Sequence, residues 1–194
     1  MSEELILNAA AVSAETEENL VRLVAGGHVP AFEQIYTLYA SSIYNYVLRL
    51  IGEPAAAEEV LQDVFLVLWR NASSFRAEAK VKTWLLRIAH HQAVSWLRRQ
   101  RPTAWPSEEL PADDEPLDEH MAQHWQIAQV RAAIAELPYK QRAVIELTFA
   151  HGLSYTEIAQ IMDCPVGTVK SRMSYALRAL AKRLTNDLAG DKSS

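Results

Sequence analysis

Apolar residues recur at helical spacing through most of this 194-residue chain, and no stretch keeps up the apolar–polar alternation of a strand. Only six glycines and eight prolines are present, which is too few for the many tight turns of a β-rich fold. With 49% hydrophobic residues, the chain is too apolar to be disordered throughout. The sequence therefore predicts an all-α protein.

Two helical domains are expected, because one segment between them has a different composition. Residues 102–118 carry four prolines and several acidic side chains but no basic one, as expected of a flexible acidic linker. The predicted boundaries are a flexible tail at 1–15, a first domain at 16–101, the linker at 102–118, a second domain at 119–188 and a tail at 189–194. Helices are expected at 16–25, 31–50, 55–71 and 81–100, and then from 119 onward with breaks at Pro138, His151-Gly152 and Cys164-Pro165.

Several classes of protein are excluded by what the sequence lacks. No run of roughly 18 uncharged apolar residues exists, so no membrane-spanning helix is predicted. The start, Met1-Ser2-Glu3-Glu4, is acidic and unlike a secretory signal, and the single Cys164 excludes a disulfide framework. We therefore expect a cytoplasmic protein.

Enzymatic and metal chemistry also find no support in the sequence. There is no glycine-rich phosphate loop, nucleophile elbow or cluster of metal-ligand residues. His120 and His124 have a zinc-compatible spacing, but no further ligands lie nearby, and a solvated helix start explains them as well. The sequence predicts no enzyme, no cofactor and no metal.

Charge is segregated along the chain, although its net value is only −5. Residues 1–69 and 102–163 each sum to −8, whereas residues 70–101 sum to +7 and residues 164–194 to +4. Two basic blocks within an acidic protein suit a polyanionic partner. Alternating charge that merely keeps helices soluble is the other explanation.

The second basic block has the pattern of a helix-turn-helix. Ser154-Tyr155-Thr156-Glu157 has the form of a capping box that opens a short helix, and a turn at Asp163-Cys164-Pro165 precedes a longer one. The longer helix is expected to turn one apolar stripe to the core: Val169, Met173, Leu177, Leu180 and Leu184. Its basic, hydroxyl-rich start suits phosphates and base edges in the major groove of DNA.

The first basic block follows a helix with an unusual outer face. Leu66 and Trp69 lie beside Asp63 and need a partner, which is either another helix of the domain or another protein. Downstream, the aromatic residues Phe75 and Trp84 stand among basic side chains. Cations that hold a backbone and aromatic surfaces that receive unstacked bases suit single-stranded nucleic acid.

Four stretches, in this order and spacing, resemble the extracytoplasmic-function (ECF) sigma factors of the sigma-70 family. They are AEEVLQDVFLVLWRN, FRAEAKVKTWLLRIAHHQAVSWLRRQR, ELPYKQRAVIEL and GLSYTEIAQIMDCPVGTVKSRMSYALRAL. The resemblance implies a region 2-like helical bundle, which binds core RNA polymerase and melts the −10 promoter element. It also implies a region 4-like helix-turn-helix, which reads the −35 element, and an anti-sigma factor as a further partner.

The resemblance carries roles over to residues of this chain. The set implied to bind core polymerase is Leu61, Gln62, Asp63, Phe65, Leu66 and Trp69. The set implied to act on the −10 element is Phe75, Arg76, Lys80, Lys82, Trp84, Arg87, His91 and Arg98. The set implied to read the −35 element is Thr168, Lys170, Ser171, Arg172, Ser174, Tyr175 and Arg178. One departure is that His90-His91 and Ser95 stand where the family often has Arg-Asn and Asp, so no −10 base preference is carried over.

The expected function is promoter-specific initiation of transcription with core RNA polymerase, held off by an anti-sigma factor until a stress signal arrives. A stand-alone helix-turn-helix regulator is the alternative, but it has no need of a second nucleic-acid surface at residues 70–101.

Overall fold

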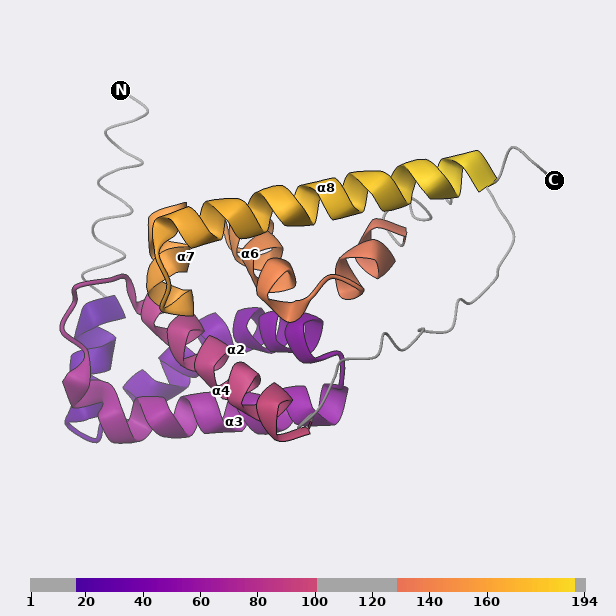
Figure 1. Ribbon diagram of the computed structural model, residues 1–194. Coiled ribbons are helices and arrows are strands. Elements are labelled where there is room, and N and C mark those ends of the chain that lie inside the picture. Colours follow the sequence, from indigo (N-terminus) through magenta and orange to yellow (C-terminus); the bar gives the residue numbers. More distant parts are fainter. Residues whose placement is uncertain (1–16, 101–128, 191–194) are drawn as a thin grey trace, which may run out of the picture. The chain divides into compact units, whose positions relative to one another are not determined.

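The computed structural model describes residues 17–100 and 129–190, with side chains to residue 183, and these residues form helices and no strand (Figure 1). Residues 17–25 and 129–135 are helical. The other elements are α2 (Val29–Ile51), α3 (Pro54–Asn71), the 3-10 turn η1 (Ala72–Ser74), α4 (Val81–Gln100), α6 (Tyr139–Phe149), α7 (Tyr155–Met162) and α8 (Val166–Gly190). The predicted all-α fold is confirmed. The predicted N-terminal tail, the predicted linker, the His120/His124 pair and residues 191–194 lie outside the described residues, whereas residues 189–190 of the predicted C-terminal tail are the last of α8.

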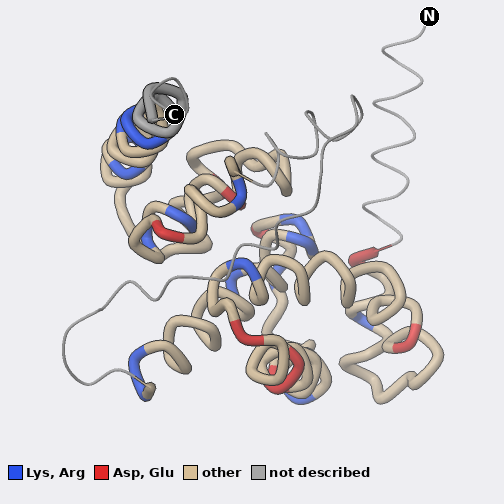
Figure 2. The backbone as a smooth tube through the Cα atoms, turned by 90° about the vertical axis from the view of Figure 1, so that its right-hand side faces the viewer, with Lys and Arg blue, Asp and Glu red and all other residues tan. Residues whose placement is uncertain are grey.

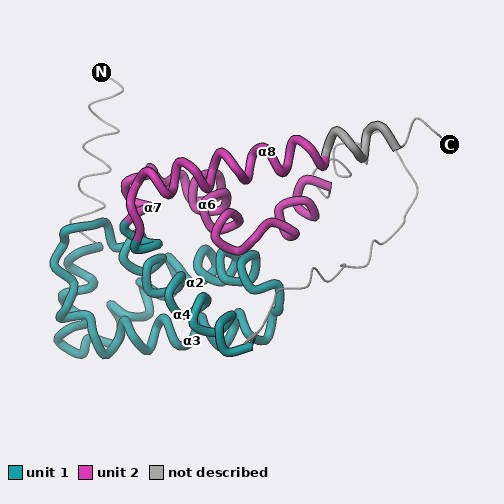
Figure 3. The backbone as a smooth tube through the Cα atoms, in the orientation of Figure 1, with its two compact units in different colours: residues 1–100, 160–163 teal, residues 101–159, 164–194 magenta. Residues whose placement is uncertain are grey.

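The chain divides into two compact units, which are coloured separately in Figure 3. Of the described residues, 17–100 and 160–163 belong to the first unit, and 129–159 and 164–190 belong to the second. The exact domain boundaries given above stay a prediction, because the segment between the units is not described.

The first unit is built from three long helices that pack on one another in every pairing, α2 on α3, α3 on α4 and α2 on α4. Each helix buries residues at helical spacing, so that one stripe of each faces a shared core. The largest fully buried side chains in it include Ile35, Ile43, Leu50, Leu68 and Leu85. The turn from α2 to α3 needs only Gly52 and Glu53.

Gly52 ends α2 by taking the left-handed conformation, with φ 83°, and its N–H bonds the carbonyl of Leu48. A residue with a Cβ adopts this conformation at a cost, so glycine is the usual residue at such a helix end. Pro54 then stands in the first turn of α3, where its missing N–H removes no helical hydrogen bond.

A buried polar contact crosses the apolar core of the first unit. The Tyr46 hydroxyl lies 2.7 Å from Nδ1 of His90 and joins α2 to α4. Tyr46 is 1% exposed and His90 5% exposed. His90 is therefore a core residue, whereas its neighbour His91 is exposed, as expected of adjacent residues on a helix.

The second unit packs α6 on α8, and α7 and α8 form the predicted helix-turn-helix. The capping box is confirmed, because both the N–H and the hydroxyl of Ser154 bond Oε2 of Glu157, at 2.9 and 2.7 Å. The Glu157 N–H in turn bonds the Ser154 hydroxyl. At the other end of α7, Asp163 takes a left-handed conformation with φ 51°, and the Cys164 N–H reaches back to Ala159 O.

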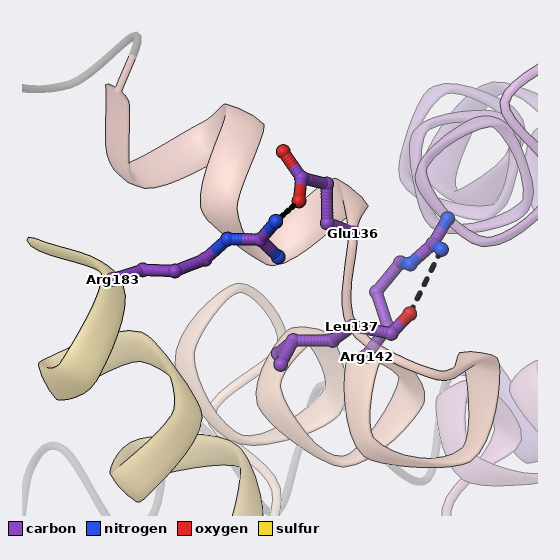
Figure 4. Close-up of polar contacts among 4 residues, drawn as sticks. All are labelled: Glu136, Leu137, Arg142 and Arg183. Atoms are coloured by element: carbon purple, nitrogen blue, oxygen red, sulfur yellow. Dashed lines mark hydrogen bonds and ion pairs between the residues drawn. The ribbon is translucent and has the colours of Figure 1, made fainter. Parts of the chain in front are cut away.

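Two polar contacts involve the residues just before α6 (Figure 4). Arg183 of α8 forms an ion pair with Glu136, and Nη2 of Arg142 donates to the carbonyl of Leu137 at 3.0 Å. Burial lowers the pKa of Arg142, and the nearby carboxylate of Glu146 opposes that effect.

The apolar stripe predicted for α8 is wrong at one position, and the side chain of Leu184, its last member, lies outside those described. Leu177 is 47% exposed, whereas Ala176 is fully buried. The buried stripe is Val169, Met173, Ala176 and Leu180. Steps of 4, 3 and 4 residues follow the 3.6-residue period of a helix, so the small Ala176 faces α6 and the larger Leu177 is turned away.

We expect Tyr46→Phe to lower the free energy of unfolding by about 0.5–1.5 kcal/mol, because it removes the buried hydrogen bond and keeps the ring. Chemical denaturation of the full chain measures this change. The control is Tyr44→Phe, the same change at a half-buried tyrosine of the same helix. An equal loss in both variants would contradict a specific role of the contact with His90.

Candidate polymerase and nucleic-acid interfaces

The outer face of α3 exposes apolar side chains, as the sequence indicates. Leu66 is 48% exposed and Trp69 39% exposed, and Gln62 is exposed one turn before Leu66. These positions lie three or four residues apart and so share one side of the helix. A polar and an apolar group on one exposed helix side can contact another protein.

The other residues predicted for this surface lie deeper. Leu61 and Asp63 are half-buried, and Phe65 is only 3% exposed. The Phe65 ring lies 6.0 Å from that of Phe32 and 4.6 Å from that of Tyr36. Phe65 therefore belongs to the packing between α2 and α3 in this structure, and its contact with core polymerase stays a prediction.

Two aromatic residues of α2 extend the exposed apolar surface, and the sequence analysis missed both. Phe32 is half-buried with its ring 5.4 Å from Trp69, and Tyr36 is 45% exposed. The apolar surface thus consists of Phe32 and Tyr36 of α2 with Leu66 and Trp69 of α3. Their spacing of four residues on α2 could have revealed that they share a side, but not that this side lies next to α3.

The segment between η1 and α4 forms a hollow with an aromatic wall. The rings of Phe75 and Trp84 are 5.1 Å apart and inclined by 48°. Arg76 and Arg87 also line the hollow, and both are exposed. Ala77, at the tip of the loop, has φ 56°, which strains a residue with a Cβ and sharpens the turn.

Basic side chains continue from this hollow along one side of α4. Arg87, His91, Ser95 and Arg98 are all exposed and recur every three or four residues, as predicted. In the loop, Lys80 is exposed, and Lys82 at the start of α4 is half-buried. The arrangement offers cations for a phosphate backbone beside aromatic rings for bases.

On α8, most of the predicted DNA-reading residues share the side opposite the buried stripe. Lys170, Ser171, Ser174, Tyr175 and Arg178 are exposed, and Tyr175 is 59% exposed. No acidic residue stands between Cys164 and Arg183, whereas Lys and Arg residues recur along this part of the helix (Figure 2). Such a surface can approach DNA without like-charge repulsion.

Two residues of this set lie at the edge of that surface. Thr168 is half-buried, and its carbonyl accepts a hydrogen bond from the Ser171 hydroxyl at 3.0 Å. Arg172 is half-buried too, with Nη1 3.5 Å from Sγ of Cys164 in the helix-turn-helix turn. Arg172 is therefore held to the turn in this structure, whereas Arg178 is not engaged by the turn.

Among residues 17–100 and 129–190, no group of three or more His, Cys, Asp or Glu side chains could hold a metal ion. No helix there is both long and apolar enough to cross a membrane.

Comparison with known proteins matches both units. The family model "Sigma-70 region 2" matches residues 35–103, and "Sigma-70, region 4" matches residues 127–180. ECF RNA polymerase sigma factor SigK of Mycobacterium tuberculosis is 34% identical over 168 residues, covering 83% of this chain and 89% of the relative. RNA polymerase sigma-H factor of Pseudomonas aeruginosa is 31% identical over 188 residues, covering 89% and 96%.

Solved structures are also similar to this chain. The sigma factor RpoE in complex with the anti-sigma factor NepR, from Bartonella quintana, is 26% identical with a TM-score of 0.61, covering 79% of this chain and 96% of that one. CnrH in complex with the cytosolic domain of CnrY has a TM-score of 0.66 over 88% and 98%, and at 22% identity it supports the fold alone. Since similarity to the sigma factors extends over both units and most of the chain, the protein belongs to the ECF sigma factors of the sigma-70 family.

Proposed function

We propose that the three surfaces divide the work of an ECF sigma factor among them. The apolar surface of α2 and α3 docks on core RNA polymerase, the hollow and basic side of α4 act on the melted −10 element, and α8 reads the −35 element. Polymerase supplies the chemistry of synthesis, so the chain itself needs no catalytic residue. The cytoplasm, where the polymerase and the chromosome are, is the proposed place of action.

The observation that carries this proposal is that one chain holds two basic surfaces and an exposed apolar one. A helix-turn-helix regulator that acts alone needs the surface of α8, but it has no use for the second basic side on α4. Relatives that match both units are named sigma factors, which also disfavours that alternative. A direct experiment is promoter-dependent transcription by purified core polymerase with and without the chain.

An anti-sigma factor is the proposed regulator. The similar RpoE of Bartonella quintana was solved with one. In this chain, the exposed Leu66 and Trp69 and the basic side of α8 are the surfaces whose coverage would stop both polymerase docking and promoter reading. We propose that the inhibitor contacts both units at once.

We expect Arg178→Ala to weaken binding of the holoenzyme to a duplex −35 element by about 1–3 kcal/mol if Arg178 reads a base edge. Competition with labelled promoter fragments measures it. Arg178→Lys distinguishes the reading of a base edge from a simple charge contact, because lysine keeps the charge but loses the bidentate geometry. The control is Lys140→Ala, which removes an exposed charge from α6 of the same unit. Unchanged binding after substitution of Lys170, Arg172 and Arg178 would show that α8 does not read the promoter.

Leu66→Asp should reduce binding of the chain to core polymerase by at least about tenfold, because it places a charge in an apolar contact. The matched control is Leu38→Asp. Leu38 is 57% exposed on α2, two residues after Tyr36 and so on another side of that helix. Co-purification measures binding, and circular dichroism shows whether the helices persist. Equal binding by the folded Leu66→Asp variant and by the control would reject the docking surface.

Inhibition through both units predicts that the affinity for the inhibitor depends strongly on the connection between the units. We expect a chain cut at a protease site inserted within 102–118 to leave two halves, each of which binds the inhibitor far more weakly than the intact chain. The second contact is intramolecular only while the chain is whole, which raises its effective concentration. Calorimetry before and after cleavage measures the difference. One half that keeps the full affinity would instead show inhibition through a single unit.

A further inference from the structure

Two adjacent histidines of α4 lie in different surroundings. His90 is 5% exposed and its Nδ1 lies 2.7 Å from the buried Tyr46 hydroxyl, whereas His91 is exposed. The two rings are 5.9 Å apart and inclined by 75°. A positive charge on His90 would have to be buried in the core at a high free-energy cost. His91 is therefore the histidine of the pair that can take up a proton while the protein stays folded.

His91 stands in the middle of the basic side of α4. Arg87 precedes it by one helical turn, Ser95 follows it by one turn, and Arg98 lies one turn further along. All four side chains are exposed. Since α4 (Val81–Gln100) contains no acidic residue, the helix itself offers only positive and neutral groups on this side.

The groups around His91 leave a charge on its ring available to another molecule. α2 and α3 pack on α4, and Tyr46 of α2 contacts the histidine pair through His90 with a neutral hydroxyl. The carboxylate of Asp163, which is grouped with the first unit, lies 3.7 Å from Nη2 of Arg87. Among the described residues, none forms a hydrogen bond or ion pair with His91 itself.

We propose that His91 binds a phosphate of the melted −10 strand in its protonated form, so that the chain holds an opened promoter more tightly as the pH falls. The inference rests on the proposed role of the basic side of α4 at the −10 element. Arg87 and Arg98 stay charged at every physiological pH and supply a constant attraction for the DNA backbone. The charge of a histidine, in contrast, changes between about pH 5 and 8.

The direction of the effect follows from the two forms of the imidazole ring. The neutral ring carries one donor and one acceptor, whereas the protonated ring carries two donors and a positive charge. A phosphate oxygen is a negatively charged acceptor, so it binds the protonated ring more tightly. Binding of DNA therefore takes up a proton, and the affinity for DNA increases as the pH falls. This control acts on the sigma factor itself and needs no inhibitor.

The experiment uses the full chain bound to core polymerase and labelled promoter fragments that are already unpaired over the −10 element. The affinity is measured at about pH 6 and about pH 8, each over a series of salt concentrations. Wild-type holoenzyme should gain affinity at the lower pH by roughly two- to fivefold more than His91→Asn does. Its plot of log affinity against log salt should also become steeper by up to about 0.7, as expected for one further phosphate contact on a single strand.

The variants separate His91 from the other groups that titrate in polymerase and DNA. His91→Asn carries a polar side chain that does not titrate, so it reports the pH dependence of everything else. His91→Lys is charged at both pH values and should bind more tightly than wild type at the higher one, with the same pH dependence as His91→Asn.

The matched control is His28→Asn, at an exposed histidine of the same unit that lies outside α4. Nδ1 of His28 accepts a hydrogen bond from the Ala31 N–H at 3.1 Å and so caps α2. Asparagine caps helices well, so this variant should fold. It should keep the full pH dependence of the wild type.

Equal pH dependence in wild type and His91→Asn overturns the inference, and so does a wild-type affinity that decreases at the lower pH relative to His91→Asn. Arg98→Ala distinguishes this result from a failure of the proposed function. If Arg98→Ala weakens binding while wild type and His91→Asn share one pH dependence, the basic side of α4 contacts the promoter but His91 is not its proton-dependent member. If neither Arg98→Ala nor His91→Lys changes binding at either pH, this side does not contact the promoter, and both the inference and its proposed role are wrong.

Discussion

The packing of the Phe65 ring against Phe32 and Tyr36 determines what the first unit presents to other molecules. Because Phe65 points into the contact between α2 and α3, Leu66 is turned about 100° away from it, into solvent. On the same side, the ring of Phe32 also lies beside that of Trp69. One buried ring thus creates an exposed apolar surface that spans two helices.

The two kinds of surface place different demands on the fold. An apolar surface lowers the solubility of the free chain. Each of α2, α3 and α4 turns one apolar stripe into the shared core, although Val29 and Leu38 of α2 are exposed as well. A basic surface demands an absence of acids, and α8 meets this demand between residues 164 and 183. The segregated charge of the sequence thus gives the first unit one basic surface, on α4, and the second unit another, on α8.

Much of this architecture could be predicted because it depends on local patterns. The helical period, the Ser154–Glu157 capping box and the exposed side of α4 with Arg87 and Arg98 are properties of neighbouring residues. The error in α8 concerns the margin of a helix face. Leu177 lies beside a core stripe, and whether such a residue is covered depends on which helix packs there, which periodicity does not reveal. For the same reason, the part played by Phe32 and Tyr36 could not be found without the fold.

The two-residue turn between α2 and α3 also bears on how the protein is made. Helix pairs that are close in sequence form contacts of low sequence separation, and chains rich in such contacts fold within microseconds to milliseconds. A ribosome adds residues at about 5–20 per second, so synthesis of the chain beyond residue 100 takes roughly 5–20 s. The first unit therefore has time to fold, and to expose its apolar surface, while α8 is still being synthesised. A partner of that surface can engage the nascent chain before the second unit exists.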